Sequence, residues 1–206
     1  MLLSVILGTL FLLQGANAST SWGSCSNLKL QENFKVEKYM GLWYEQARDK
    51  NFRYEKGDCQ QSRYALNNET NETIYVLNSQ YRDDKTGFDT AAGVAHCNGP
   101  HCNLKFRWYL PEGDYRVVAT DYDNYAVVYS CRNILRFAKM EYIWVLTREK
   151  EVDPECAGKA KALIRERMPW YDVDRNLYET KQGGKCRYLP VDEIEGMQEA
   201  DFVEDQ

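Results

Sequence analysis

Histidine is scarce in this chain. His96 and His101 are its two histidines, and both lie in one short stretch. A serine or cysteine nucleophile needs an adjacent base to activate it, and the chain has no histidine outside that stretch that could act as this base. The sequence also lacks a glycine-rich phosphate-binding loop and a recognisable pair of catalytic carboxylates. We therefore predict that this protein is not an enzyme.

An excess of positive charge is missing too. The formal net charge is -5, and the acidic residues gather in 191–206, where seven of them stand without a basic residue. Binding nucleic acid calls for a basic face, so we expect no nucleic-acid partner. Residues 191–206 are predicted to be a disordered, solubilising tail.

Long apolar runs are absent after the first residues. Residues 1–18 carry no charge, residues 2–13 are mostly apolar, and Ala16-Asn17-Ala18 has the small-x-small form of a signal-peptidase site. That run is shorter than the about 20 residues of a membrane span. We predict a signal peptide over 1–18, one domain over 19–190, and a secreted, extracellular protein.

Cysteines and sequons fit that compartment. Seven cysteines follow the leader, and in an oxidising environment most should pair, with at least one thiol left over. Two adjacent N-glycosylation sequons begin at Asn68 and Asn71, in a polar run where a turn would expose them.

Alternating apolar and polar residues predict an antiparallel series of strands. The expected strands are 42–50, 58–67, 73–82, 88–96, 103–110, 115–122, 125–132 and 140–148. About eight strands with short links can close into an up-and-down barrel, although a sandwich fits the strand pattern nearly as well. One helix is expected over 154–168, capped by Asp153, and a short strand near 172–178.

Three stretches then resemble the motifs of a known family. The first contains Gly41 and Trp43, the second is Thr120-Asp121-Tyr122, and the third runs from Trp144 to Arg148. In this order and spacing they resemble the lipocalins, most closely the group with apolipoprotein D, retinol-binding protein and the insect bilin-binding proteins. The resemblance implies an all-β, eight-stranded barrel, or calyx, with one C-terminal α-helix packed outside, and Arg148 lying across Trp43 at its closed end.

The resemblance, combined with strand alternation, also implies which side chains face the calyx. The expected ligand-binding residues are Tyr64, Phe106, Trp108, Tyr115, Val117, Val128, Tyr142 and Trp144. Inward aromatic residues could fill a solid core or line a cavity, since eight-stranded barrels can hold one small ligand, and the resemblance favours the cavity.

A carrier of a small hydrophobic molecule is therefore expected, with no required cofactor. The ligand would be a fatty acid, a steroid or a retinoid, or alternatively a pigment such as biliverdin or a carotenoid. A few lipocalins are isomerases or de-epoxidases, and these provide the alternative of another class.

The resemblance further implies the disulfides Cys25–Cys131 and Cys59–Cys186. Cys97 and Cys102 depart from the relatives, and with the two histidines they suggest a zinc or haem site. The Asn98-Gly99-Pro100 turn and the oxidising compartment instead favour a Cys97–Cys102 disulfide and no metal. Cys156 is then the free thiol, on the apolar stripe of the helix.

Apolar residues also stand in a link that should lie at the barrel mouth: Ile134, Leu135 and Phe137, flanked by Arg132, Arg136 and Lys139. Leu110 and Pro111 lie in a second such link. These side chains either narrow the entrance or contact a membrane surface or a lipoprotein.

Overall fold

The computed structural model describes residues 20–67, 73–82, 87–107, 109–151 and 153–190. The predicted leader, the acidic tail, both sequon asparagines and Trp108 lie outside these residues and stay predictions. Within the described part of the chain, no helix is both long and apolar enough to cross a membrane.

Eight antiparallel strands form a closed barrel. Its strands are β2 (Gly41–Asp49), β3 (Asp58–Leu66), β4 (Thr73–Arg82), β5 (Gly87–Asn98), β6 (His101–Lys105), β7 (Gly113–Thr120), β8 (Tyr125–Leu135) and β9 (Ala138–Thr147). Each pairs with the next, and β9 pairs with β2 to close the ring. Two short strands, β1 (Thr20–Trp22) and β10 (Leu177–Glu179), add to β9 and β2. The barrel is the predicted one, and the sandwich is excluded.

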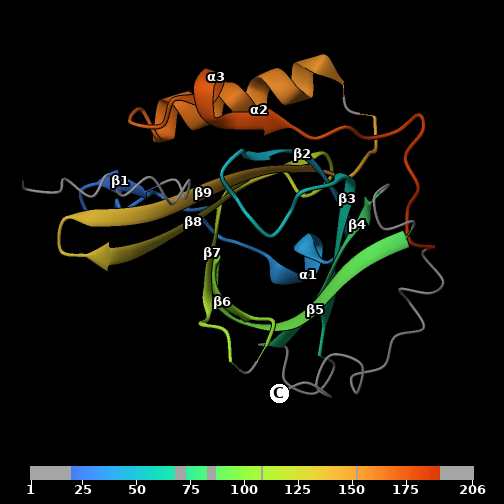
Figure 1. The fold of residues 1–206 in the computed structure, drawn as a ribbon, viewed down its shortest axis with the longest axis horizontal. Coiled ribbons are helices and arrows are strands. Elements are labelled where there is room, and N and C mark those ends of the chain that lie inside the picture. The colour runs from blue at the N-terminus through green and yellow to red at the C-terminus, as the bar shows by residue number, and fades with distance from the viewer. Residues whose placement is uncertain (1–19, 68–72, 83–86, 108, 152, 191–206) are drawn as a thin grey trace, which may run out of the picture.

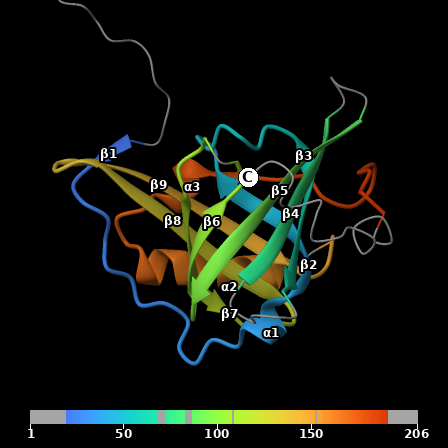
Figure 2. The ribbon, with the colours of Figure 1, turned by 90° about the horizontal axis from the view of Figure 1, so that it is seen from below.

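In the described residues three helices lie around this barrel: α1 (Val36–Tyr39), α2 (Pro154–Arg167) and α3 (Val173–Asn176). Figure 1 shows α2 and α3 outside the ring of strands. Figure 2 shows α1 at one end of the barrel and the loop between β2 and β3 at the other. We call these the closed end and the mouth.

Both faces of the strands beneath α2 are buried. Ala126 and Val128 point into the barrel, whereas Val127 and Tyr129 point outward to the helix, and all four are 0% exposed. This explains why β8 reads as a continuous apolar run instead of an alternating one. The outward residues pack with Ala160, Ile164 and Met168 from the end of α2 and the residue after it.

The start of α2 follows local rules. The Asp153 carboxylate accepts a hydrogen bond from the backbone N–H of Glu155 at 2.9 Å, and Pro154 occupies the first helical position. Proline is suited to that position because the first N–H groups of a helix have no partner within it.

The structure contains the three disulfides expected from the sequence: Cys25–Cys131, Cys59–Cys186 and Cys97–Cys102. The third joins directly opposed residues of β5 and β6, so neither thiol is available for the alternative metal site. Cys156 is a free, partly buried cysteine on α2.

Two element predictions are wrong. The strand expected over 103–110 ends at Lys105, because β7 begins at Gly113 opposite Leu104 and the intervening residues, with Pro111, form the connection. The strand expected near 172–178 starts with the short helix α3 instead, because the side chain of Asp172 caps that turn at the N–H of Arg175.

Candidate ligand-binding site in the barrel

The closed end is held by Trp43 and Arg148. Trp43 is 0% exposed, and its indole N–H donates to the Tyr39 carbonyl at 2.8 Å. The guanidinium carbon of Arg148 lies 3.7 Å from the centre of the indole ring, a contact of about 0.5–2 kcal/mol. The same guanidinium donates to the carbonyls of Leu42, Tyr122 and Lys38 at 2.8, 2.9 and 3.0 Å. The expected crossing of Arg148 over Trp43 is therefore present.

Gly41 is required by this arrangement. Its φ is +95°, in the region that favours glycine. A Cβ at this position would also stand 3.3 Å from Nη1 of Arg148. The glycine thus lets the chain enter β2 directly beneath the guanidinium.

The Thr120-Asp121-Tyr122 turn closes the same end between β7 and β8. The hydroxyl of Thr120 donates to the carbonyl of Tyr125 at 2.7 Å and accepts from the N–H of Tyr122 at 2.9 Å. Asp121 accepts from the N–H groups of Asn124 and Tyr125 at 2.8 and 3.0 Å. Partial burial alone would raise the pKa of Asp121, but these hydrogen bonds lower it overall. These contacts build the turn, and Tyr122 packs against the interior cluster.

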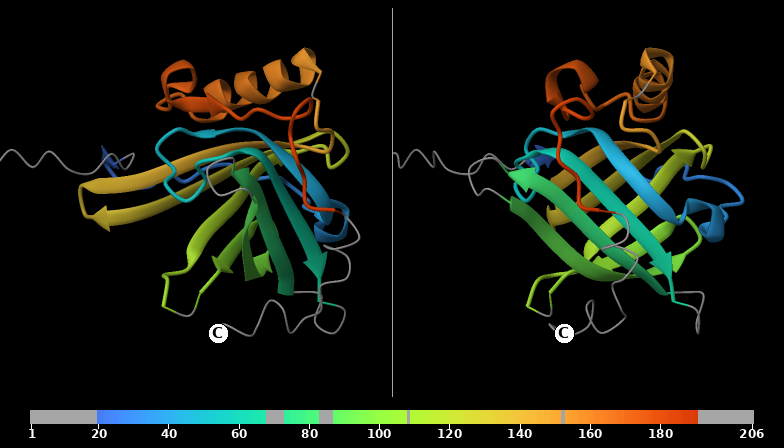
Figure 3. Two further views of the ribbon diagram at one scale, coloured as in Figure 1. Left: turned by 45° about the vertical axis from the view of Figure 1, so that its right-hand side comes forward. Right: turned by 90° about the vertical axis from the view of Figure 1, so that its right-hand side faces the viewer.

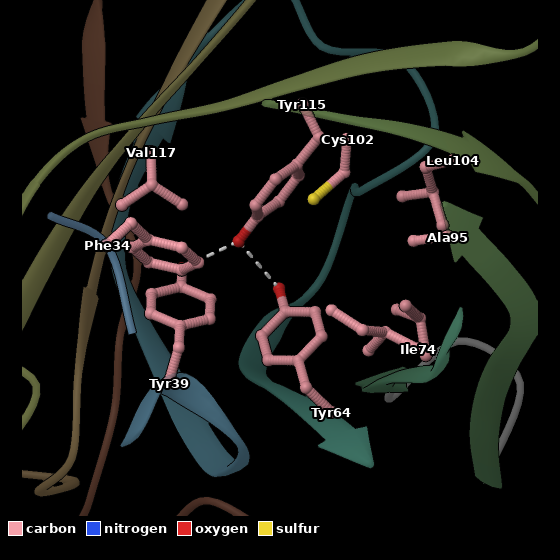
Figure 4. Close-up of a pocket in the computed structure, with 10 residues that line it drawn as sticks. Phe34, Tyr39, Tyr64, Ile74, Ala95, Cys102, Leu104, Tyr115 and Val117 are labelled. Atoms are coloured by element: carbon pink, nitrogen blue, oxygen red, sulfur yellow. Dashed lines mark hydrogen bonds between the residues drawn. The ribbon is translucent and has the colours of Figure 1, made fainter. Parts of the chain in front are cut away.

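Three tyrosine hydroxyls meet inside the barrel, near the closed end (Figure 4). The oxygens of Tyr39 and Tyr115 are 2.7 Å apart, and those of Tyr64 and Tyr115 are 3.0 Å apart. The three tyrosines lie on α1, β3 and β7, which are far apart in the sequence. Burial is the main cause that raises the pKa of all three, to about 12 for Tyr64 and well above the usual value for Tyr39 and Tyr115.

This tyrosine cluster borders a small cavity. The cavity has a volume of about 20 Å³, which is room for about one water molecule. Its ten lining residues are Phe34, Tyr39, Tyr64, Ile74, Val76, Ala95, Cys102, Leu104, Tyr115 and Val117. Apart from this small cavity, side chains fill the closed end of the barrel.

Some of the predicted ligand-binding residues line this cavity, and others lie between the cavity and the mouth. Tyr64, Tyr115 and Val117 line the cavity. Val128 belongs to the same interior cluster, and Phe106 and Trp144 pack against it. Tyr142 lies nearer the mouth, with its ring centre 6.0 Å from that of Trp144.

The loop between β2 and β3 closes the mouth. In Figure 1 it crosses the ring of strands. Its Phe52 packs edge-on against Tyr142 and Trp144, with ring centres 5.0 and 4.9 Å apart. The carboxylate of Glu55 accepts a hydrogen bond from the indole N–H of Trp144 at 2.9 Å. One aromatic and one acidic side chain thus occupy the entrance.

Ionisable groups meet at this entrance. Burial, the charge of Glu45 and a hydrogen bond to Glu45 raise the pKa of Glu55 well above its ordinary value. Glu45 itself pairs with Arg48, whose Nη1 is 2.7 Å from Oε1 of Glu45. Arg48 also donates to the Gly57 carbonyl at 3.2 Å, so its guanidinium connects β2 to the end of the loop.

Sequence reasoning missed Phe34, Tyr39, Phe52 and Glu55. Tyr39 had a usable signal, because it precedes the Gly41–Trp43 motif by two residues and its carbonyl receives the indole N–H. Phe52 and Glu55 had none, since they lie in a loop without periodicity.

The contact proposed from the sequence for Lys139 is wrong. Its side chain is buried and pairs with Glu141 at 2.9 Å, because Lys139 lies on the outward face of β9, where it packs against Trp170. Arg132 and Arg136 remain exposed, as do Ile134 and Phe137.

A closed eight-stranded calyx with a helix outside and an aromatic interior defines the class of small ligand-enclosing barrels. Residues 34–181 match the lipocalin-like domain model. Apolipoprotein D of Cavia porcellus is 35% identical over 167 residues, which cover 80% of this chain and 86% of that protein. The chain belongs to the lipocalin family.

Solved structures agree on the fold. Lobster apocrustacyanin A1 superposes with a TM-score of 0.69 at 21% identity, covering 84% of this chain and 95% of the other. Insecticyanin from the tobacco hornworm Manduca sexta has a TM-score of 0.69 at 18% identity, covering 81% and 90%.

Proposed function

We propose that this protein is a secreted carrier that binds one small hydrophobic ligand in the calyx. The observation that carries this proposal is a closed barrel whose interior is aromatic and aliphatic, with three hydroxyls at its base and a loop across its mouth. Ligand sites combine such an apolar lining with a few convergent polar groups. The three disulfides support an oxidising, extracellular location.

The ligand must displace side chains on entry. Ligand pockets typically measure about 300–1,000 Å³, whereas the cavity at the closed end measures about 20 Å³. Phe52 lies on a loop and touches Tyr142 and Trp144, so moving that loop opens the most direct path. A ligand that buries about 300 Å² of apolar area would gain about 7 kcal/mol before its entropic costs.

Candidate ligands are fatty acids, steroids and retinoids, with biliverdin or a carotenoid as the pigment alternative. Purification of the secreted protein, an absorption spectrum and mass spectrometry of the extract distinguish them. Visible absorption by the purified protein would favour the pigment.

A carrier explains the interior better than an enzyme does. Some lipocalin enzymes use a free cysteine in the calyx, but Cys59 on β3 is bonded to Cys186. The ten described residues that line the cavity include no histidine, carboxylate or free thiol. Nothing among them can act as a general base at neutral pH, since the tyrosines have raised pKa values.

Titration with retinol tests the carrier. Tryptophan fluorescence should be quenched in the wild type, and Trp144→Ala should lose most of the change and bind several-fold more weakly. Trp22→Ala is the matched control, because Trp22 is 84% exposed and lies outside the barrel. Unchanged affinity in Trp144→Ala would contradict the assignment of the site.

We also propose that the β8–β9 hairpin contacts a lipid surface. This hairpin extends beyond the barrel, with β1 alongside (Figure 3). Near its tip Trp22, Ile134 and Phe137 are 84%, 43% and 54% exposed, and the rings of Trp22 and Phe137 stack at 5.6 Å. Aromatic residues flanked by arginines suit the membrane interface, so a ligand could transfer from lipid without crossing water.

Flotation with liposomes tests this contact. Wild-type protein should float with phosphatidylcholine liposomes that contain anionic lipid, and the triple variant Trp22→Ser, Ile134→Ser, Phe137→Ser should not. Trp170→Ser is the control, because Trp170 is 42% exposed outside the barrel, near the end of α2. Equal flotation of the wild type and the triple variant would contradict the proposal.

A further inference from the structure

The tyrosine cluster has one hydroxyl hydrogen that its own hydrogen bonds do not use. Tyr39 and Tyr64 each share a hydrogen bond with Tyr115. Three hydroxyl groups thus share two hydrogen bonds. Each hydroxyl has one hydrogen to donate, so one hydrogen remains for a further acceptor whichever way the chain of bonds runs.

The neighbouring cavity matches the size of that acceptor. Its volume of about 20 Å³ accommodates one oxygen-sized group. Around the hydroxyls the lining is apolar, with Ile74, Val76, Val117 and the disulfide sulfur of Cys102. The cavity surface itself is apolar, and the three tyrosine hydroxyls are the polar groups beside it, so a ligand oxygen that does not reach them would lose its hydrogen bonds.

A negative charge is unfavourable at this spot. None of the ten described lining residues is a lysine, arginine or histidine. Burial raises the pKa of Tyr39, Tyr64 and Tyr115 because a tyrosinate there would be poorly solvated. A ligand carboxylate would meet the same penalty.

The mouth disfavours a carboxylate as well. Glu45 and Glu55 face one guanidinium, that of Arg48, and Glu45 already pairs with it. A ligand carboxylate left at the mouth, by a fatty acid that enters tail first, would meet the same burial and the same charge of Glu45 that raise the pKa of Glu55.

We propose that the calyx selects uncharged ligands that carry a hydroxyl or carbonyl oxygen at their leading end, and that Tyr39, Tyr64 and Tyr115 bind this oxygen. The selection builds on the proposed carrier function and narrows its ligand class. Alcohols, aldehydes and ketones on a long apolar skeleton are favoured, and free carboxylic acids are disfavoured.

Two matched pairs test the selection: retinol against retinoic acid, and hexadecanol against hexadecanoate, in fluorescence titrations at pH 7.4. Members of a pair share a carbon skeleton and differ at the terminal oxygen group. We expect the alcohol of each pair to bind about tenfold or more tightly than the acid. Equal or tighter binding of both acids overturns the selection and leaves the carrier function standing, whereas no binding by any of the four overturns both.

Tyr115→Phe tests the residue assignment, because Tyr115 links the other two hydroxyls. Retinol should bind about three- to tenfold more weakly, and retinoic acid should change little, so the preference shrinks. Tyr64→Phe is a second variant should the first unfold, as checked by circular dichroism. Tyr125→Phe is the control, since Tyr125 packs on the helix side of the barrel. A preference unchanged in a folded Tyr115→Phe or Tyr64→Phe would overturn the assignment.

Discussion

The two ends of the barrel are stabilised in different ways. At the closed end, Trp43 is completely buried beneath the guanidinium of Arg148, and backbone carbonyls from three segments accept hydrogen bonds from that guanidinium. At the mouth, a loop places Phe52 against the rings of Tyr142 and Trp144, and Glu55 accepts one hydrogen bond from Trp144. Hydrogen bonds of Lys56 and Gly57 to Gln80 fix the β3 end of that loop, so the motion that opens the entrance belongs to the segment with Phe52.

This contrast assigns different roles to chemically similar residues. Both Trp43 and Trp144 face the interior, and each donates its indole N–H. Trp43 donates to a backbone carbonyl of α1, whereas Trp144 donates to a side chain on a loop. The first therefore contributes to the stability of the fold, and the second is available to a ligand when the loop moves.

Substitution of Trp43 should give one of the two largest losses of stability. Trp43→Ala removes a fully buried indole and should lower the free energy of unfolding by about 3–5 kcal/mol. Trp22→Ala, at an 84% exposed position, should change it by about 0.5 kcal/mol or less. Urea unfolding of both variants measures the difference, and a loss below about 1 kcal/mol for Trp43→Ala would contradict the structural role of the closed end.

Removal of a long-range disulfide should give a loss of similar size, and the losses should follow loop length instead of position. Cys25–Cys131 spans 106 residues, and Cys97–Cys102 spans 5. Loop-closure entropy predicts a loss of about 5 kcal/mol for the first pair and about 2 kcal/mol for the second.

Paired Cys→Ala variants, unfolded in urea, measure these values. The Cys97–Cys102 pair lies at the closed end. If its removal lowered the free energy of unfolding more than removal of Cys25–Cys131 does, the location of a disulfide, and not chain entropy, would determine its contribution to stability.

The smallest effect concerns pH at the mouth. Glu55 faces Glu45 and Arg48 from β2 and Trp144 from β9, and its pKa is raised above the ordinary 4.5. The closed loop therefore binds a proton more readily than the open loop. Its advantage is complete below about pH 4.5 and is lost as the pH rises through the raised value.

Glu55→Gln should remove this dependence. Hydrogen exchange of residues 50–57 should accelerate from pH 5 to pH 8 in the wild type, after correction for intrinsic exchange, and stay nearly constant in the variant. Asp121→Asn is a control, because Asp121 lies in the closed-end turn and its pKa is lowered. The same acceleration in Glu55→Gln as in the wild type would contradict the role of Glu55.

By itself the sequence determined the barrel, the crossing of Arg148 over Trp43 and which face of β8 points inward. Each depends on short-range regularities: alternation along a strand, a glycine at positive φ and a motif of fixed spacing. For the same reason the start of α2 at Pro154 was predictable to the residue.

Only the tertiary structure decided what fills the calyx. Tyr39, Tyr64 and Tyr115 meet because α1, β3 and β7 converge on one point, and no local pattern encodes that convergence. Phe52 reaches Trp144 across 92 positions of sequence because a loop folds over the mouth. Contacts of this kind depend on how the ring of strands closes, which is a property of the whole chain.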